Sequence, residues 1–428
     1  MNIIIHRGTH EIGGSCVEVR DNGQAILIDI GMPLTCGPVT WKKRPTIDEQ
    51  RLFLPDIPGL YKGDSRPAPV QAVLISHAHQ DHYGLLHFVK DEIPVYVGQA
   101  SRYLIEFTRF IITSKQEPMS NVRIFSSYND FNIGCFHVKP FLMDHSAFDA
   151  HAFLISSGDK KVFYSGDFRD HGRKKAAFDS LVKSGPQNVD ALLLEGTMLS
   201  RPNEKVPSEA ELEEQIISIC RVTPKMVLAY CSSQNIDRLV SFYKAANKTK
   251  RKFIADIYTA NVLQKISGTN PNIPHPGFSN LAVWFPFNLT KKLLKQDPKN
   301  LVYPFVKYKV KLGDMLKNQE KTILLVRPSM RNIIQGLNSL DGCSFIYSMW
   351  KGYLKEDYTK EFIDLVTRKG ARYEYVHTSG HAVLETLQKL AKRLSPKMTI
   401  PIHCEKPEEY RIYFKNVINV NDKDIITV

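Results

Sequence analysis

The most chemically distinctive stretch of the sequence is HAHQDH, which places three histidines and an aspartate in six positions. The whole chain of 428 residues contains only 14 histidines. Imidazole nitrogens and carboxylate oxygens are ligands that suit Zn, Fe or Mn. A single histidine at a strand end is usually structural, but four such side chains within one turn of chain predict a metal site. The candidate ligands are His77, His79, Asp81 and His82.

Three further candidate ligands follow apolar runs, where a buried strand would present them at the edge of a sheet. His145 stands in MDHSAF, Asp167 in FYSGDFRD and His403 in IPIHCE. Each of them alone is explained equally well as an ordinary polar strand end. Together with HAHQDH they form one set of candidate ligands.

The elements that must position this set are predicted to be strands. Short β-rich runs alternate with Gly and Asp turns in NIII, SCVEVR, QAILIDIG, VQAVLIS and IPVYVG, and later in HAFLISS, KKVFYSGD and VDALLLEG. The helical segments between them are too irregular for a Rossmann repeat. The pattern favours two packed sheets flanked by helices.

The pattern changes near residue 200. SEAELEEQIISICRV predicts a helix with Ser208 as its N-cap and Glu211 at the capping-box position. KMVLAYC, NIDRLVSFYKAANK and KFIADI then form a strand–helix–strand series typical of a parallel α/β unit. Residues 267–312 are rich in Pro, Lys and aromatic residues and fit no clear pattern.

The order of the motifs resembles the metallo-β-lactamase fold of binuclear hydrolases: HAHQDH, a later His, SGD and a late His. Glu195 in LLLEGT, His381 in HTSGHA and His403 in PIHCE also resemble the three additional motifs of the β-CASP nucleases, the branch that contains ribonuclease J. The resemblance covers nearly the whole chain. Few residues follow PIHCE, which implies a ribonuclease J-like chain without the C-terminal domain of that family, and YSMWKGYL stands where the family has a different loop.

The resemblance implies the fold class and its boundaries. We expect an α/β protein in which residues 1–200 and 373–428 form a metallo-β-lactamase αββα sandwich. Residues 201–372 would form an inserted α/β β-CASP domain.

The resemblance also implies two divalent metal ions, Zn or Mn, and their ligands. It assigns one ion to His77, His79 and His145, the other to Asp81, His82 and His403, and the bridging position to Asp167. Such a set leaves room for a shared water, and two ions about 3.5–4 Å apart can activate that water and polarise a phosphoryl group.

Further residues receive roles in catalysis from the same resemblance. Asp81, Glu195 and His381 are expected to be catalytic, with His381 at the scissile phosphate, where it could neutralise developing charge. Asp29, at the end of AILIDIG, is expected to orient a ligand histidine, and Glu195 is expected to act similarly. Either carboxylate could instead cap a turn.

Five residues are candidates for binding the phosphates of a substrate. Ser232, Ser233 and Asn235 lie in CSSQN, where a strand ends and a helix begins, so they could offer donors at a helix N-terminus. An ordinary helix cap explains them equally well. His377 and Ser379 stand beside His381 in HTSGHA.

The formal net charge of +13 and the pI of about 9.2 suggest an anionic partner. The basic clusters are WKKR (41–44), RDHGRKK (169–175), KTKRK (248–252), TKKLLK (290–295) and KYKVK (307–311). Several stand beside aromatic residues, a mixture that suits single-stranded nucleic acid. A solvated charged face is the alternative for each cluster.

The seven cysteines lack C-x-x-C pairs, which indicates neither a disulfide framework nor a cysteine zinc site and favours a reducing cytoplasm. We expect Cys231 and Cys404 to be small buried residues rather than nucleophiles. The first residues are too short an apolar run for a signal peptide, and no run approaches the length of a membrane span.

The sequence and the resemblance thus predict a metal-dependent nuclease that hydrolyses phosphodiesters of single-stranded RNA. In the family that it resembles, a histidine in the last motif, here His403, implies RNA rather than DNA. A DNA nuclease, a small-phosphodiester hydrolase on the same scaffold and a non-catalytic RNA-binding subunit are the alternatives. Internal cutting and cutting from the 5′ end both stay open, as do a monomer and a homodimer.

Overall fold

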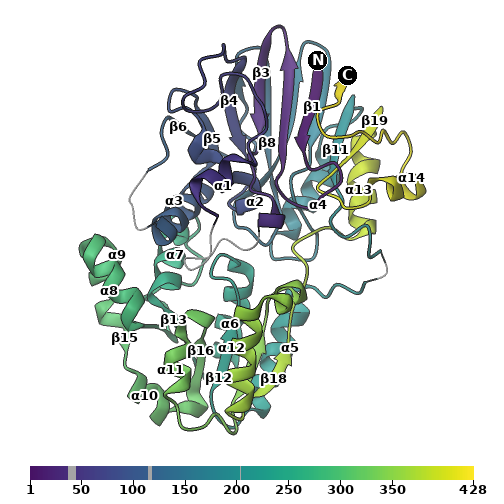
Figure 1. The fold of residues 1–428 in the computed structure, drawn as a ribbon. Helices are drawn as coiled ribbons and strands as arrows, with labels where there is room; N and C mark the ends of the chain where they lie inside the picture. The colour runs from purple at the N-terminus through teal and green to yellow at the C-terminus, as the bar shows by residue number, and fades with distance from the viewer. Residues whose placement is uncertain (37–44, 114–117, 203) are drawn as a thin grey trace. The chain divides into compact units, whose positions relative to one another are not determined.

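The computed structural model describes residues 1–36, 45–113, 118–202 and 204–428. They divide into two compact units (Figure 1). Unit 1 comprises Met1–Asp170, Lys174–Lys205 and Gly380–Val428, and unit 2 comprises His171–Arg173 and Val206–Ser379. The predicted basic cluster at 41–44 lies outside the described residues.

The first sheet of unit 1 has seven strands in the order β20-β1-β2-β3-β4-β5-β6. Their bounds are β1 (Asn2–Arg7), β2 (Cys16–Asp21), β3 (Gln24–Ile28), β4 (Val70–Ile75), β5 (Val95–Gly98), β6 (Val122–Phe125) and β20 (Ile425–Thr427). Strands β3 to β6 pair in parallel. The carboxyl ends of β3 and β4 therefore lie at the same edge.

The second sheet of unit 1 has six strands in the order β19-β11-β10-β9-β8-β7. Their bounds are β7 (Phe131–Ile133), β8 (Phe136–Met143), β9 (Ala150–Ser157), β10 (Lys160–Tyr164), β11 (Ala191–Glu195) and β19 (Met398–Ile402). Strands β10, β11 and β19 are parallel, and β9 is antiparallel to both β8 and β10. Strands β8, β10, β11 and β19 therefore all end at one edge.

The two sheets of unit 1 share a hydrophobic core. Ile28 and Leu74 of the first sheet belong to the same buried cluster as Phe153 and Leu193 of the second. The other face of the second sheet packs on α4 (Lys175–Ser184) and α13 (Leu384–Leu394). Helix α3 (Gln99–Thr113) packs on β5. This is the predicted αββα arrangement, and the mixed α/β fold class is confirmed. The remaining helices of unit 1 are α1 (Ile47–Arg51), α2 (Gln80–Tyr83) and α14 (Tyr410–Tyr413).

Unit 2 contains one parallel sheet of seven strands in the order β15-β14-β13-β16-β12-β17-β18. The strands are β12 (Val227–Tyr230), β13 (Lys252–Asp256), β14 (Leu281–Trp284), β15 (Lys309–Val310), β16 (Thr322–Leu325), β17 (Ser344–Tyr347) and β18 (Arg372–Tyr375). The helices are α5 (Glu209–Val222), α6 (Ile236–Lys248), α7 (Ile257–Ser267), α8 (Phe287–Gln296), α9 (Pro298–Leu301), α10 (Leu312–Lys317), α11 (Arg331–Gln335) and α12 (Asp357–Arg368).

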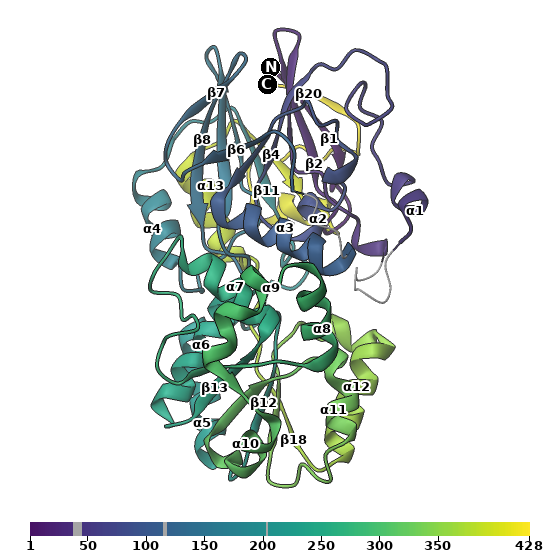
Figure 2. The same cartoon turned by 90° about the vertical axis from the view of Figure 1, so that its left-hand side faces the viewer.

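The local predictions for unit 2 succeed where capping residues and apolar periodicity agree. Ser208 caps α5 and forms the predicted capping box with Glu211. The strand–helix–strand series is observed as β12, α6 and β13. Residues 267–312, which fitted no pattern, contain β14, α8, α9, β15 and the 3-10 segment η3 (Tyr303–Tyr308) (Figure 2).

The seven cysteines are free thiols. Cys231 and Cys404 are buried, and burial raises the pKa of each to about 12. A thiol with so high a pKa is a poor nucleophile at neutral pH, which agrees with the structural role expected for both. No helix among the described residues has the length and hydropathy needed to cross a membrane.

Candidate metal centre

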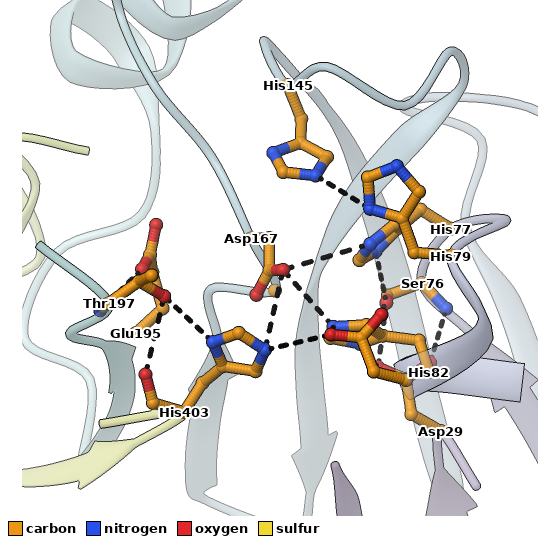
Figure 3. A network of polar contacts seen from close by, with 12 residues as sticks. Asp29, Ser76, His77, His79, His82, His145, Asp167, Glu195, Thr197 and His403 are labelled. Carbon is orange, nitrogen blue, oxygen red and sulfur yellow. Dashed lines mark hydrogen bonds and ion pairs between the residues drawn. The ribbon is translucent and has the colours of Figure 1, made fainter. Parts of the chain in front are cut away.

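The predicted ligands meet at the edge of unit 1 where the parallel strands end (Figure 3). His77 follows β4, His145 follows β8, Asp167 follows β10 and His403 follows β19. The other ligands come from the short helix α2, which contains Asp81 and His82 and has His79 as its N-cap residue. Strand direction therefore brings together residues that are more than 300 positions apart in the sequence.

Asp167 lies at the centre of the cluster. Its Oδ2 atom is 3.1 Å from Nε2 of His82, 3.7 Å from Nε2 of His403 and 3.8 Å from Nε2 of His77. The same oxygen is 3.8 Å from Nδ1 of His381. One carboxylate thus faces four imidazoles, which is the position expected for a ligand shared between two ions.

The remaining ligand atoms lie on two sides of Asp167. On one side, Nε2 of His145 is 3.3 Å from Nδ1 of His79. On the other, Oδ2 of Asp81 is 3.4 Å from Nε2 of His403. Two ligand atoms bound tetrahedrally to zinc at about 2.1 Å lie about 3.4 Å apart. The spacings between these atoms therefore suit a metal ion on each side.

A buried atom without a hydrogen-bond partner supports the same interpretation. Nε2 of His77 is buried and has no hydrogen-bond partner. Leaving a buried polar atom unsatisfied costs about 1–3 kcal/mol, whereas a metal ion would satisfy it. The groups of ligand atoms that lie within 4.8 Å of one another are His77/His79/His145, His77/His82/Asp167, Asp81/His82/His403 and Asp167/His381/His403. The donor set fits two divalent ions.

Asp29 and Ser76 orient two of the histidines from behind. Asp29 is fully buried, with φ at +60°, and its carboxylate lies 2.8 Å from Nδ1 of His82. It also accepts hydrogen bonds from the hydroxyls of Ser76 and Tyr164, at 2.7 and 2.8 Å. Because the Ser76 hydroxyl donates to Asp29, its oxygen can accept from Nδ1 of His77 at 3.0 Å. Fixing Nδ1 in this way leaves Nε2 free for a metal.

Two other histidines are also oriented through their Nδ1 atoms, by groups that the sequence did not predict. The Gly380 carbonyl accepts a hydrogen bond from Nδ1 of His145 at 2.6 Å, and Thr197 Oγ1 lies 2.8 Å from Nδ1 of His403. A Cβ at position 380 would lie 2.7 Å from Oγ of Ser146 and 3.2 Å from Cε1 of His145, so a larger residue there would require these side chains to shift.

Carboxylates and imidazoles in the cluster shift one another's pKa values. Burial alone would raise the pKa of Asp167, but His403 and His82 hold it well below its usual range. Burial opposes protonation of His82, yet Asp167 and Asp29 raise its pKa well above the usual value. Burial lowers the pKa values of His77 and His145. Neutral imidazole is the form that binds metals, so these two histidines are ready ligands.

Glu195 lies beside His381. Among the described residues, it forms no hydrogen bond with a histidine that is predicted to bind a metal. Its Oε1 is 3.5 Å from Nδ1 of His381 and accepts a hydrogen bond from the backbone N–H of Ala382 at 3.2 Å. Burial lowers the pKa of His381, but Glu195 and Asp167 outweigh it and raise that pKa. The His381 ring is stacked on that of His403, with centroids 5.5 Å apart. The carboxylates therefore favour the protonated form of His381 at the rim of the ligand cluster.

The five candidate phosphate-binding residues belong to unit 2 and make contacts within it. The Ser232 hydroxyl accepts from the Gln234 N–H at 3.2 Å, and Asn235 caps α6 by accepting from the Arg238 N–H at 3.1 Å. These contacts are those of an ordinary helix start.

The other three candidates make contacts of different kinds. Ser233 is buried, and its hydroxyl accepts from Arg327 at 2.7 Å. The Ser379 carbonyl accepts from His171 at 2.9 Å, and the His377 ring contacts that of Tyr375. None of the five belongs to the ligand groups of unit 1 found among the described residues.

In two of the predicted basic clusters the arginines make internal contacts, whereas the lysines of the cluster 248–252 stay exposed. In the cluster 169–175, Arg169 is fully buried 3.5 Å from Asp144, and Arg173 pairs with Glu213 at 2.8 Å. In the cluster 248–252, Arg251 is buried and donates to backbone carbonyls. These arginines stabilise the fold and are not a nucleic-acid surface.

Comparison with known proteins agrees with the geometry. A β-lactamase superfamily domain matches residues 48–230. Ribonuclease J of Sinorhizobium meliloti is 23% identical over 408 residues, covering 89% of this chain and 64% of that protein. Ribonuclease J of Mycoplasma genitalium is 22% identical over 411 residues, covering 93% of this chain and 67% of that protein. Ribonuclease J of Helicobacter pylori is 22% identical over 410 residues, covering 93% and 55%. The chain thus spans about two thirds or less of the length of these relatives.

A solved structure shares the fold along the whole chain. The crystal structure of a protein of unknown function from Enterococcus faecalis V583 superposes with a TM-score of 0.78 at 20% identity, covering 100% of this chain and 99% of that one. At this identity the likeness concerns the fold alone.

Proposed function

We propose that this chain, a metallo-β-lactamase-fold protein similar to ribonuclease J over most of its length, is a binuclear metal-dependent nuclease that hydrolyses phosphodiester bonds of single-stranded RNA. The observation that carries the proposal is the position of Asp167, whose carboxylate faces four imidazoles at 3.1–3.8 Å in a buried cluster of seven candidate ligands. Nε2 of His77 is buried and makes no hydrogen bond among the described residues, as expected of an atom that a metal ion would occupy.

The ligand assignment follows the grouping around Asp167. One ion would be held by His77, His79 and His145, and the other by Asp81, His82 and His403, with Asp167 bridging. Bound Zn or Mn would supply an activated water and positive charge for the phosphoryl oxygens.

The side chains around the ligands have separate roles in this proposal. His381, kept protonated by Glu195 and Asp167, donates a hydrogen bond to a phosphate oxygen or a proton to the leaving oxygen. Glu195 acts through His381 and is therefore a positioning residue. Asp29 keeps His82 in the tautomer that presents Nε2 to the metal.

RNA is the proposed substrate because the relatives that match most of the chain carry the name ribonuclease J. A complete ligand set argues against a non-catalytic RNA-binding subunit, which need not retain it. The excess of basic residues favours a polyanion over a small phosphodiester. A cytoplasmic location would fit this substrate and the free cysteines.

The test is digestion of end-labelled RNA and DNA of equal sequence, each with a 5′-hydroxyl, monophosphate or triphosphate. Elemental analysis of the same preparation should approach two transition-metal ions per chain. We expect single-stranded RNA to be cut faster than duplex, with a preference for the 5′-monophosphate. One ion or none after supplementation with Zn and Mn would contradict the binuclear site, and equal cutting of duplex DNA would contradict the substrate.

A further inference from the structure

One surface of unit 2 combines many lysines with few acidic residues. It is formed by residues 285–311, which include α8, α9 and η3, and is called here the α8–η3 surface. Within unit 2, α8 contacts α9, both labelled in Figure 2, and α9 contacts η3. This segment contains a single acidic residue, Asp297, which caps α9. It also contains seven lysines: Lys291, Lys292, Lys295, Lys299, Lys307, Lys309 and Lys311.

Large apolar side chains stand out from the same surface. Phe287 is 74% exposed and Tyr303 is 58% exposed, and Leu294 and Val306 are also exposed. Helix α8 buries only Leu293. Scattered single exposed apolar residues need no explanation, but several on one short segment mark an interaction surface.

The lysines and rings are interleaved on this surface. Nζ of Lys291 lies 5.8 Å from the ring centroid of Phe287, and Nζ of Lys307 lies 4.9 Å from that of Tyr308. Among the described residues, neither these two lysines nor Lys295 forms an ion pair. By contrast, Lys248 on α6 pairs with Glu213 and Glu214 at 3.1 and 2.8 Å.

We propose that the α8–η3 surface binds single-stranded RNA, with bases stacking on Phe287 and Tyr303 and phosphates contacting Lys291, Lys295 and Lys307. Exposed rings alternating with unpaired cations are the combination that single strands bind, because every base offers a face for stacking and every linkage a charge. The choice of RNA rests on the proposed function. The surface itself is a second contact for the strand, on a different unit from the ligand cluster.

An anionic membrane is the less suitable partner for this surface. A helix that lies in a membrane interface needs a continuous apolar face opposite its charged one. On α8 the exposed Phe287, Lys291, Leu294 and Lys295 share one side of the helix, so charge interrupts the apolar residues. Lysines that lie between aromatic rings suit a polyanion whose bases can stack better than they suit lipid tails.

The test is the binding of fluorescent single-stranded (U)20 to the full-length chain, followed by anisotropy in EDTA so that no hydrolysis occurs. F287A and Y303A should each weaken binding about tenfold or more. K291A/K295A should lower the slope of log K against log salt concentration by about 1.4, since each phosphate contact on a single strand contributes about 0.7. The matched control, K355A/K360A, removes the same charge from exposed positions elsewhere on unit 2 and should leave both quantities near wild type.

Three outcomes would contradict RNA binding by the α8–η3 surface. The control pair K355A/K360A could weaken (U)20 binding as much as K291A/K295A does, or duplex RNA could compete with (U)20 as well as single-stranded RNA does. The third outcome is that the variant combining F287A/Y303A with K291A/K295A still binds (U)20 like the wild type. Binding of the wild type to phosphatidylglycerol vesicles but not to (U)20 would also contradict RNA binding by this surface. If the wild type binds (U)20 through these residues but hydrolyses no RNA when supplied with metal, the α8–η3 surface stands and the nuclease proposal fails.

Discussion

Both units bury charged side chains near the carboxyl ends of parallel strands, but among the described residues only unit 1 gathers imidazoles and carboxylates into groups that could hold a metal ion. In unit 1, Asp167 faces four imidazoles and Nε2 of His77 has no hydrogen-bond partner. In unit 2, Arg238 is fully buried and donates to both carboxylate oxygens of Glu209, at 3.3 and 3.0 Å, and to the Val376 carbonyl at 3.2 Å.

The difference separates a structural network from a candidate site. The Glu209 carboxylate is also contacted by the Ser241 hydroxyl at 3.1 Å, so the partners around Arg238 are all supplied by the fold. A buried network of this kind specifies the packing of one unit. Buried polar residues become candidates for metal binding when several ligand atoms lie together and are not all satisfied by hydrogen bonds, as is the case around Asp167.

Replacing the central carboxylate should give the largest effect. Asp167→Asn keeps the size of the side chain but removes the charge that faces four imidazoles. We expect metal content to fall from two ions to one or none, and hydrolysis to fall by more than the roughly 10²–10⁴-fold typical of one charge-stabilising group. Elemental analysis and single-turnover hydrolysis on the same preparation measure both.

Asp190→Asn is the matched control, because Asp190 is buried in unit 1 but pairs with Lys397 at 2.7 Å, away from the ligands. It should retain both ions. Normal metal content in Asp167→Asn would show that Asp167 is not a ligand and would remove the contrast between the two units.

Two stacked histidines should separate into different roles. His403→Ala should lower metal content and activity together, because it removes a ligand. His381→Ala should keep both ions and most RNA binding, while the hydrolytic rate falls by about 10²–10⁴-fold. Measuring the metal content and the single-turnover rate of each variant distinguishes the two roles. Loss of a metal in His381→Ala, with both retained in His403→Ala, would mean that the two assignments are reversed.

Breaking the closed network of unit 2 should affect stability and not metal content. Arg238→Met removes the charged partner of the buried Glu209 carboxylate, which costs about 3–5 kcal/mol. Urea unfolding followed by tryptophan fluorescence reports mainly on unit 2, since two of the three tryptophans of the chain, Trp284 and Trp350, lie there. The double variant Arg238→Met/Glu209→Met should recover part of the loss. Loss of metal from Arg238→Met while it remains folded would show that this network is not merely structural.

The sequence predicted those features whose cause is local. Ser208 and Glu211 cap α5 because the capping box acts within three residues. HAHQDH predicted a cluster of candidate ligands, which the structure also brings together, because four ligand side chains fall within one turn of chain. Cys231 was recognised as a small buried residue by the same local reading.

Features that depend on distant partners were not predicted. Ser76 and Thr197 orient ligand histidines, yet their residue types carry no specific pattern, and Thr197 lies 206 positions from His403. Arg173 and Arg251 looked like parts of a basic surface because their acceptors, Glu213 and several carbonyls, come from other elements. Whether a cation is exposed or paired is decided by the tertiary fold, which also leaves Lys291, Lys295 and Lys307 of the α8–η3 surface exposed.

The smallest expected effect concerns Asn235, which the sequence offered both as a phosphate ligand and as a helix cap. In the structure its side chain accepts from the Arg238 N–H at 3.1 Å, as a cap does. Asn and Asp cap helices about equally well, whereas Ala costs about 1 kcal/mol. Asn235→Asp should therefore leave stability, RNA affinity and hydrolysis close to wild type, and Asn235→Ala should lower stability by about 1 kcal/mol with little change in hydrolysis. Urea unfolding and the concentration dependence of single-turnover rates measure these quantities. A carboxylate placed against a substrate phosphate would repel it, so an Asn235→Asp protein of normal stability that binds RNA tenfold more weakly would show that the start of α6 contacts the substrate. In that case the strand ends of unit 2 would also serve the substrate, and the contrast with unit 1 would be one of ligand type: metal ions in unit 1 and a phosphate in unit 2.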